Sequence, residues 1–124
     1  MVKLSNSEKQ LMDLIWEQGD LFMKDIIESY PDPKPAATTV ATLLKRMQDK
    51  GFVGYRLFGN SRQYYPLVAR ESYCSLHMNE LIEDFFDNSS FRFASFFTRR
   101  SDMSEAELED LKRIVEQEIK KKKQ

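Results

Sequence analysis

The sequence has little cysteine and little histidine. Cys74 is its one cysteine and His77 its one histidine. A single cysteine excludes an intrachain disulfide framework and a cysteine-rich metal cluster. The two residues lie about one helical turn apart, but no third ligand follows at a usual spacing, so we expect both to be structural. The sequence predicts no metal site and no cofactor.

The sequence also lacks a long hydrophobic run. No apolar segment approaches the ~20 residues of a membrane span, and the N-terminus lacks a signal-peptide pattern. We therefore expect a cytoplasmic protein without stable membrane association. There is no nucleophile elbow and no phosphate-binding loop, and carboxylate pairs such as Glu83-Asp84 fall on solvent faces of expected helices. We expect no catalytic residues and no enzyme.

The charge is unevenly distributed along the 124 residues. The net charge is −4 over residues 1–33, +6 over residues 34–70 and −3 over residues 71–124, which gives −1 for the chain. A basic block in an otherwise acidic protein is typical of a nucleic-acid-binding face. The basic residues of this block are Lys34, Lys45, Arg46, Lys50, Arg56, Arg62 and Arg70.

The segment from Pro35 to Gly51 predicts one helix with two faces. Its apolar stripe has the i, i+3, i+4, i+7 spacing of a buried helix face, and Gly51 is placed to end the helix in a left-handed conformation. The opposite face suits a DNA groove, because threonine can contact base edges while lysine and arginine neutralise phosphates. An ordinary solvated face is the alternative. The stripe is Val40, Leu43, Leu44 and Met47, and the candidate DNA-binding residues are Thr38, Thr39, Thr42, Lys45 and Arg46.

Two shorter elements are expected before this helix. Ser5 and Glu8 form a capping-box pattern for a helix that Gly19 ends. Residues 21–30 predict a short strand-like segment and about two turns of helix. Three prolines in residues 31–35 then hold the loop extended, as a spacer or, alternatively, as a ligand for a partner domain. Helix, loop and helix form a helix-turn-helix with an enlarged loop.

After this helix the pattern becomes that of a β-hairpin. Residues 52–58 are rich in β-formers, residues 59–61 favour a turn, and residues 62–65 form the returning strand. This hairpin, at about 52–66, makes the helix-turn-helix winged. Polar residues near its tip could reach phosphates or the minor groove, with an ordinary solvent-facing hairpin as the alternative. The candidates are Arg56, Asn60, Ser61 and Arg62.

From Ala69 onwards we expect three helices that are rich in phenylalanine. Asn88-Ser89-Ser90 separates the first two helices, and Ser104 with Glu107 forms a second capping box. Such short helices do not readily bury this much apolar surface within one chain, so we expect a second copy to cover it. A single-chain helical subdomain is the alternative. The expected dimer interface is Cys74, Met78, Leu81, Phe85, Phe86, Phe91, Phe93, Phe96, Phe97, Leu108 and Leu111.

The order of these motifs resembles the penicillinase-repressor and methicillin-resistance-repressor family of bacterial regulators, from Leu4 to about Glu116. The resemblance rests on Ser7-Glu8…Met12…Ile15-Trp16, Asp25-Ile26-Ile27-Glu28, Thr39-Val40…Thr42-Leu43-Leu44…Arg46-Met47…Lys50-Gly51-Phe52-Val53, Gln63-Tyr64-Tyr65-Pro66 and Asp102-Met103-Ser104…Glu107-Leu108-Glu109…Leu111. It implies a mainly α fold with a small β-hairpin. A winged helix-turn-helix DNA-binding domain would span residues 1–68, and a three-helix dimerisation domain residues 69–124.

The resemblance also implies a function. It implies a homodimeric repressor on palindromic double-stranded operator DNA, with Thr39 and Thr42 near bases and Lys45 and Arg46 near the backbone. It implies a β-lactam-type signal in antibiotic resistance and a membrane-bound metalloprotease sensor as partner. In the best-known members the repressor is cleaved between an Asn and a Phe, and the corresponding candidate proteolytic site is Phe96-Phe97, where the Asn is absent. Two alternatives are a same-fold regulator of another signal, such as cell-envelope stress, and a winged helix that binds protein.

Overall fold

The computed structural model describes residues 3–124 of the chain, which form two compact units. The first unit ends at Met78 and the second is Asn79–Gln124. The predicted domain boundary, after residue 68, stays a prediction, and residues 1–2 of that predicted domain lie outside the described residues. The structure confirms the predicted fold class, since helices predominate and one small antiparallel sheet accompanies a helix-turn-helix.

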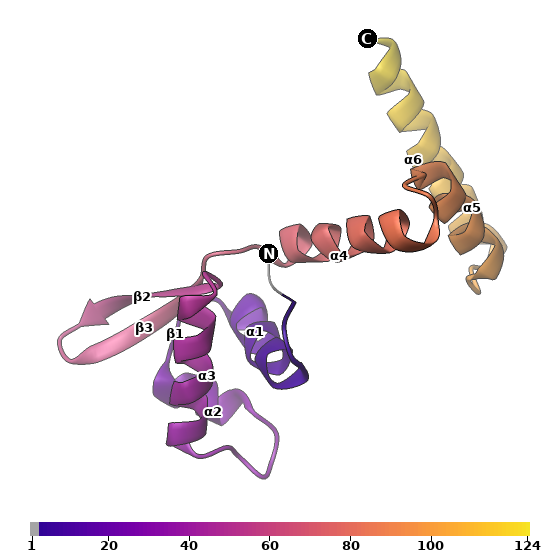
Figure 1. Ribbon diagram of the computed structural model, residues 1–124. Helices are drawn as coiled ribbons and strands as arrows, with labels where there is room; N and C mark the ends of the chain where they lie inside the picture. Colours follow the sequence, from indigo (N-terminus) through magenta and orange to yellow (C-terminus); the bar gives the residue numbers. More distant parts are fainter. Residues whose placement is uncertain (1–2) are drawn as a thin grey trace. The chain divides into compact units, whose positions relative to one another are not determined.

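Three helices form most of the first unit (Figure 1): α1 (Asn6–Gln18), α2 (Met23–Ser29) and α3 (Ala37–Asp49). The predicted capping box begins α1, because Ser5 Oγ accepts from Glu8 N at 3.3 Å and Glu8 Oε1 accepts from Ser5 N at 2.8 Å. Gly19 ends this helix with φ 82°, and Gly51 follows α3 with φ 83°. Both glycines are therefore in the left-handed region that glycine adopts without a steric penalty.

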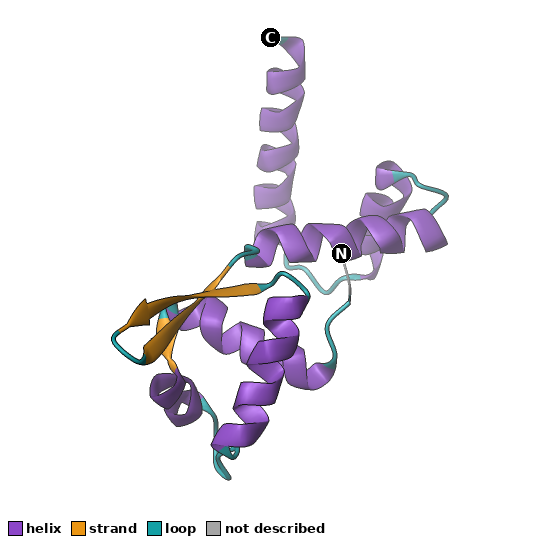
Figure 2. Cartoon of the chain, turned by 60° about the vertical axis from the view of Figure 1, so that its left-hand side comes forward, coloured by secondary structure: helices purple, strands orange, loops and turns teal. Residues whose placement is uncertain are grey.

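Three strands form the sheet: β1 (Leu21–Phe22), β2 (Val53–Phe58) and β3 (Ser61–Pro66). They are antiparallel in the order β1-β3-β2, with Leu21 opposite Tyr64 and Phe58 opposite Ser61. The Phe58–Ser61 pair leaves a two-residue loop, and Gly59, with φ 62°, supplies the positive φ that such a tight loop requires. Figure 2 shows the hairpin of β2 and β3, the wing, projecting from the helices of its unit. The predicted hairpin is confirmed.

The core of the first unit lies between its helices and its sheet. The apolar stripes of α1 and α3 are buried there together with Ile26 of α2. Trp16 lies at the edge of this core and donates from Nε1 to Val68 O at 2.8 Å. Tyr73 closes the core, since its ring lies 5.6 Å from that of Phe52 and 5.8 Å from that of Trp16. The segment after the wing therefore contributes to the packing of the first unit.

The remaining helices are α4 (Arg70–Phe85), which continues into the second unit, α5 (Ser90–Arg100) and α6 (Glu105–Lys123). Asp87 and Asn88 have positive φ, and Ser89 caps α5 by accepting from Arg92 N at 3.1 Å. Ser104 and Glu107 form the predicted capping box of α6. Among residues 79–124, only Ile82 has a buried side chain. No helix of residues 3–124 combines the length and the apolar character that crossing a membrane requires.

Candidate nucleic-acid interface

The two faces of α3 are as the spacing predicts. Its four stripe residues are buried, with exposed fractions of at most 8%. Burial of this stripe fixes which side of the helix faces solvent. The exposed side carries all five predicted DNA-binding residues of the helix, which are Thr38, Thr39, Thr42, Lys45 and Arg46.

The threonine hydroxyls on α3 differ in their bonding. Thr42 Oγ1 donates to Thr38 O at 2.9 Å, so its proton is engaged within the helix while its lone pairs face solvent. A hydroxyl bonded in this way presents an acceptor and a methyl group to a neighbouring molecule. The N-cap residue Ala36 makes no side-chain cap hydrogen bond. The first N–H groups of α3 are therefore open to water or to another acceptor.

The two cations on α3 are accessible. Lys45 pairs with Asp49 at 3.1 Å, but both side chains are more than 60% exposed, and such a surface pair is weak. Arg46 makes no ion pair with any residue in the described range 3–124. A phosphate could therefore engage either residue at low cost.

The wing holds its two arginines over tyrosine rings. The Cζ of Arg62 lies 4.4 Å from the centroid of Tyr55, and that of Arg56 lies 4.5 Å from the centroid of Tyr65. These cation–π contacts restrict side chains that would otherwise be flexible. Arg56 also lies 3.4 Å from Asp20, so its charge is partly compensated. Arg62 thus has the freer charge of the two, next to the exposed residues Asn60 of the loop and Ser61 of β3.

Lys34 and Lys50, two members of the basic block, have partners within the first unit that partly compensate their charges. Lys34 Nζ donates to the carbonyl oxygens of Glu28 and Tyr30, at 3.1 and 2.8 Å, at the C-terminal end of α2. Lys50 Nζ lies 2.8 Å from both carboxylate oxygens of Glu8. Charge counted along a sequence does not distinguish such internal partners from free cations.

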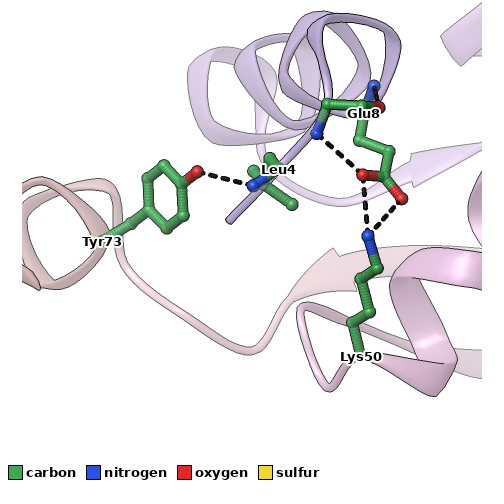
Figure 3. Close-up of polar contacts among 5 residues, drawn as sticks. Leu4, Glu8, Lys50 and Tyr73 are labelled. Carbon is green, nitrogen blue, oxygen red and sulfur yellow. Dashed lines mark hydrogen bonds and ion pairs between the residues drawn. The ribbon is translucent and has the colours of Figure 1, made fainter. Parts of the chain in front are cut away.

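Glu8 is the functional candidate that the sequence analysis missed. Its side chain is 2% exposed. Figure 3 shows the carboxylate facing the ammonium group of Lys50. Burial would raise the pKa of the Glu8 carboxyl, but hydrogen bonds from Lys50 and Ser5 and the charge of Lys50 outweigh burial and hold that pKa below its usual range. A sequence signal was available, because Glu8 precedes Leu11, Met12 and Ile15 at the i, i+3, i+4, i+7 spacing and so falls on their stripe.

The predicted interface residues of α4, α5 and α6 are largely exposed. Phe85 and Phe91 are 75% and 80% exposed, while Phe86 and Phe93 are half-buried. Phe86 lies 5.5 Å from Phe93 and 5.3 Å from Phe96, measured between ring centroids. These rings belong to a groove of about 840 Å³ in the second unit, which is lined by Leu81, Phe85, Phe86, Phe93, Phe96, Phe97, Arg100 and Ser101.

The sequence predicts that Cys74 and His77 are structural and form no metal site. Cys74 is exposed, and no group of three or more histidine, cysteine, aspartate or glutamate side chains within residues 3–124 could hold a metal ion. The interpretation of Cys74 and His77 as structural residues stays a prediction.

Comparison with known proteins identifies the family. A model of the family described as "Penicillinase repressor" matches residues 4–117. The chain is 25% identical over 114 residues to the methicillin resistance regulatory protein MecI of Staphylococcus aureus, covering 91% of this chain and 93% of that protein. It is 20% identical over 123 residues to the penicillinase repressor of Bacillus licheniformis, covering 98% of this chain and 96% of that protein.

A solved structure agrees in fold. The solution structure of monomeric Bacillus licheniformis BlaI, in complex with the blaP half-operator, superposes with a TM-score of 0.50 at 22% identity. The superposition covers 58% of this chain and 89% of that one. Because the family model covers most of the sequence, the chain belongs to the penicillinase repressor family, and it is a DNA-binding transcriptional repressor and not an enzyme.

Proposed function

We propose that the chain binds palindromic operator DNA as a homodimer and represses genes of a β-lactam-type response. In this proposal α3 enters the major groove and the wing contacts the backbone. The observation that carries it is the exposed side of α3, on which three threonines adjoin two accessible cations above a fully buried apolar stripe.

The side chains on the exposed side of α3 suit contact with the major groove of DNA. Thr39 and Thr42 would contact base edges, with Thr42 acting as an acceptor because its proton is donated to Thr38 O. Lys45 and Arg46 would contact phosphates. On the wing, Arg62 is the better phosphate ligand, since Arg56 already lies near Asp20.

The exposed phenylalanines support a second copy as partner. Phe85 and Phe91 are 75% and 80% exposed. Monomers rarely leave large contiguous apolar surfaces exposed, and burial of such a surface is favourable by about 25 cal/mol per Å². Two-fold symmetry would place the two α3 helices on half-sites separated by one or a few helical turns of DNA, roughly 34 Å each.

The proposed signal rests on the relatives. The matched proteins are named for methicillin resistance and for penicillinase repression. A membrane-bound metalloprotease sensor would then release the repressor from DNA. The candidate cleavage site, Phe96-Phe97, lies within α5, and both side chains are about half exposed.

The test is a gel shift with the duplex upstream of the chain's own gene, at two salt concentrations. We expect a retarded complex whose affinity falls steeply as salt rises, because phosphate contacts release counterions. Indifference to that duplex and to duplexes selected from random sequence would overturn the proposal. Growth with and without a β-lactam, followed by immunoblotting of the repressor, tests the signal separately, and an unchanged full-length band with unchanged repression would exclude it.

A further inference from the structure

The ion pair between Glu8 and Lys50 joins the first turn of α1 to the end of α3. Both Glu8 oxygens lie 2.8 Å from Lys50 Nζ, and one of them also accepts from Ser5 N (Figure 3). The carboxylate is therefore held from two directions. The two residues are 42 positions apart in sequence, so the contact is a tertiary one.

A buried ion pair contributes no more to stability than well-packed apolar side chains of similar volume would. Removing a carboxylate from water is expensive, and an apolar side chain of similar size would fill the same place at lower cost. Glu8 lies beside apolar neighbours of its own stripe that are fully buried. What the pair adds is a fixed position and direction for Lys50 Nζ, which must stay within hydrogen-bond distance of both carboxylate oxygens.

Lys50 is well placed to transmit that direction to α3. It is the C-cap of the helix, and its N–H donates to Arg46 O at 2.9 Å. At 100° per residue, Lys50 lies within about 40° of Arg46 and about 80° of Thr42 around the helix axis. Phe52, fully buried two residues later, holds the following backbone. The ion pair of Lys50 with Glu8 therefore limits rotation of α3 about its axis.

We propose that Glu8 is a positioning residue for sequence recognition, which acts through Lys50 to fix the rotation of α3 and thus the direction of Thr39 and Thr42. The inference rests on the proposed binding of DNA through α3. Base contacts tolerate small displacements poorly, whereas long cationic side chains can still reach phosphates after a small rotation. Loss of the pair should therefore reduce discrimination between sequences more than general affinity for DNA.

The test compares Glu8→Gln with the unaltered full-length chain on two duplexes of about 30 base pairs, or three helical turns. One is the best binder that the unaltered chain selects from a random pool, and the other is the unselected pool. We expect Glu8→Gln to weaken binding of the selected duplex about tenfold and binding of the pool less than about twofold. Asp13→Asn is the matched control, since it neutralises a partly exposed, ion-paired carboxylate on the same helix. It should leave both affinities unchanged.

The double variant Glu8→Gln, Lys50→Met removes both charges of the contact, and it is the second variant if Glu8→Gln does not fold, because Lys50→Met alone would leave a buried carboxylate unpaired. It should lower the ratio of the two affinities in the same way. Equal losses on both duplexes would show a merely structural role, and an unchanged ratio in a folded variant would show no role. Either result overturns the inference. Failure of the unaltered chain to prefer any selected duplex overturns the proposed function instead, and this inference with it.

Discussion

The ring of Tyr65 lies directly against the backbone of Gly54, its partner across the wing. A Cβ added at Gly54 would come within 2.9 Å of Tyr65 Cζ and Oη, which is closer than non-bonded carbon atoms approach. Arg56 packs on the same ring, with its Cζ 4.5 Å from the ring centroid. The absence of a Cβ at Gly54 therefore leaves room for the Tyr65 ring, and this ring in turn contacts Arg56.

Gly54→Ala should destabilise the fold by about 1 kcal/mol, because Tyr65 must move away from the new methyl group. In a Tyr65→Ala background the clash is absent, and the same change should be neutral or slightly stabilising, since alanine costs less chain entropy than glycine. Urea unfolding of the four proteins measures both values. An equal effect of Gly54→Ala in the two backgrounds would show that the ring does not limit this position.

Lys45→Ala should lower affinity for all duplexes and flatten the dependence of affinity on salt by about one phosphate equivalent. The lost pair with Asp49 is exposed and contributes little to stability. Fluorescence anisotropy titrations over a series of salt concentrations give the slope. Lys9→Ala is the control, because Lys9 makes the same i,i+4 pair with Asp13 on α1. A salt slope for Lys45→Ala equal to that of the unaltered chain contradicts the phosphate contact.

Thr42→Ala should change base preference more than overall affinity. The substitution removes an acceptor and a methyl group from the centre of the exposed side of α3 but removes no charge. Selection from a random duplex pool, followed by sequencing, gives the preference of each protein. Thr98→Ala is the control, since Thr98 also donates to the carbonyl four residues earlier but lies on α5. Identical preferences for Thr42→Ala and the unaltered chain would exclude base contact.

The free energy of unfolding should decrease at acid pH, partly because the Glu8 carboxylate becomes protonated. Its pKa is depressed in the folded chain relative to the ordinary 4.5, so its contribution is present above about pH 4.5 and is lost as the pH falls through the folded value. Urea unfolding between pH 7 and pH 3 should therefore show a shallower loss of stability in Glu8→Gln than in the unaltered chain. Parallel curves for Glu8→Gln and the unaltered chain would show that the Glu8 pKa is not depressed.

Phe91→Glu should convert the proposed dimer to a monomer without unfolding the chain. Phe91 is 80% exposed in a single copy, so the charge costs little there but is expensive within an apolar interface. Sedimentation equilibrium gives the mass, and circular dichroism reports the helices. Leu57→Glu alters a similarly exposed apolar side chain on the wing and should leave the mass unchanged. A single-copy mass for the unaltered chain at micromolar concentration would exclude the dimer.

Local chemistry made much of this fold predictable. The capping boxes at Ser5 and Ser104 mark the starts of α1 and α6, and the stripe of α3 specifies its buried face. Glycine at a two-residue loop marks the tip of the wing. Each of these features depends on residues within a few positions of one another, which is the range over which propensity and periodicity act.

The remaining features depend on tertiary contacts. The pairing of Glu8 with Lys50, and the contact of Tyr73 with Leu4, join residues 42 and 69 positions apart. No local rule pairs them, although the position of Glu8 on an apolar stripe predicts that some cation must reach it. The pairing of Glu8 with Lys50 is also one reason why the positive charge counted along residues 34–70 exceeds the charge that is free to meet DNA.

The contact of Tyr73 with Leu4 also determines where the DNA-binding unit can be cut. Tyr73 Oη accepts from Leu4 N at 2.9 Å, and its ring packs on Phe52 and Trp16. A truncation ending at residue 68 would remove this ring and uncover two aromatic side chains, whereas one ending at Met78 would retain it. An expression fragment intended for nuclear magnetic resonance or crystallisation should therefore include the first two turns of α4.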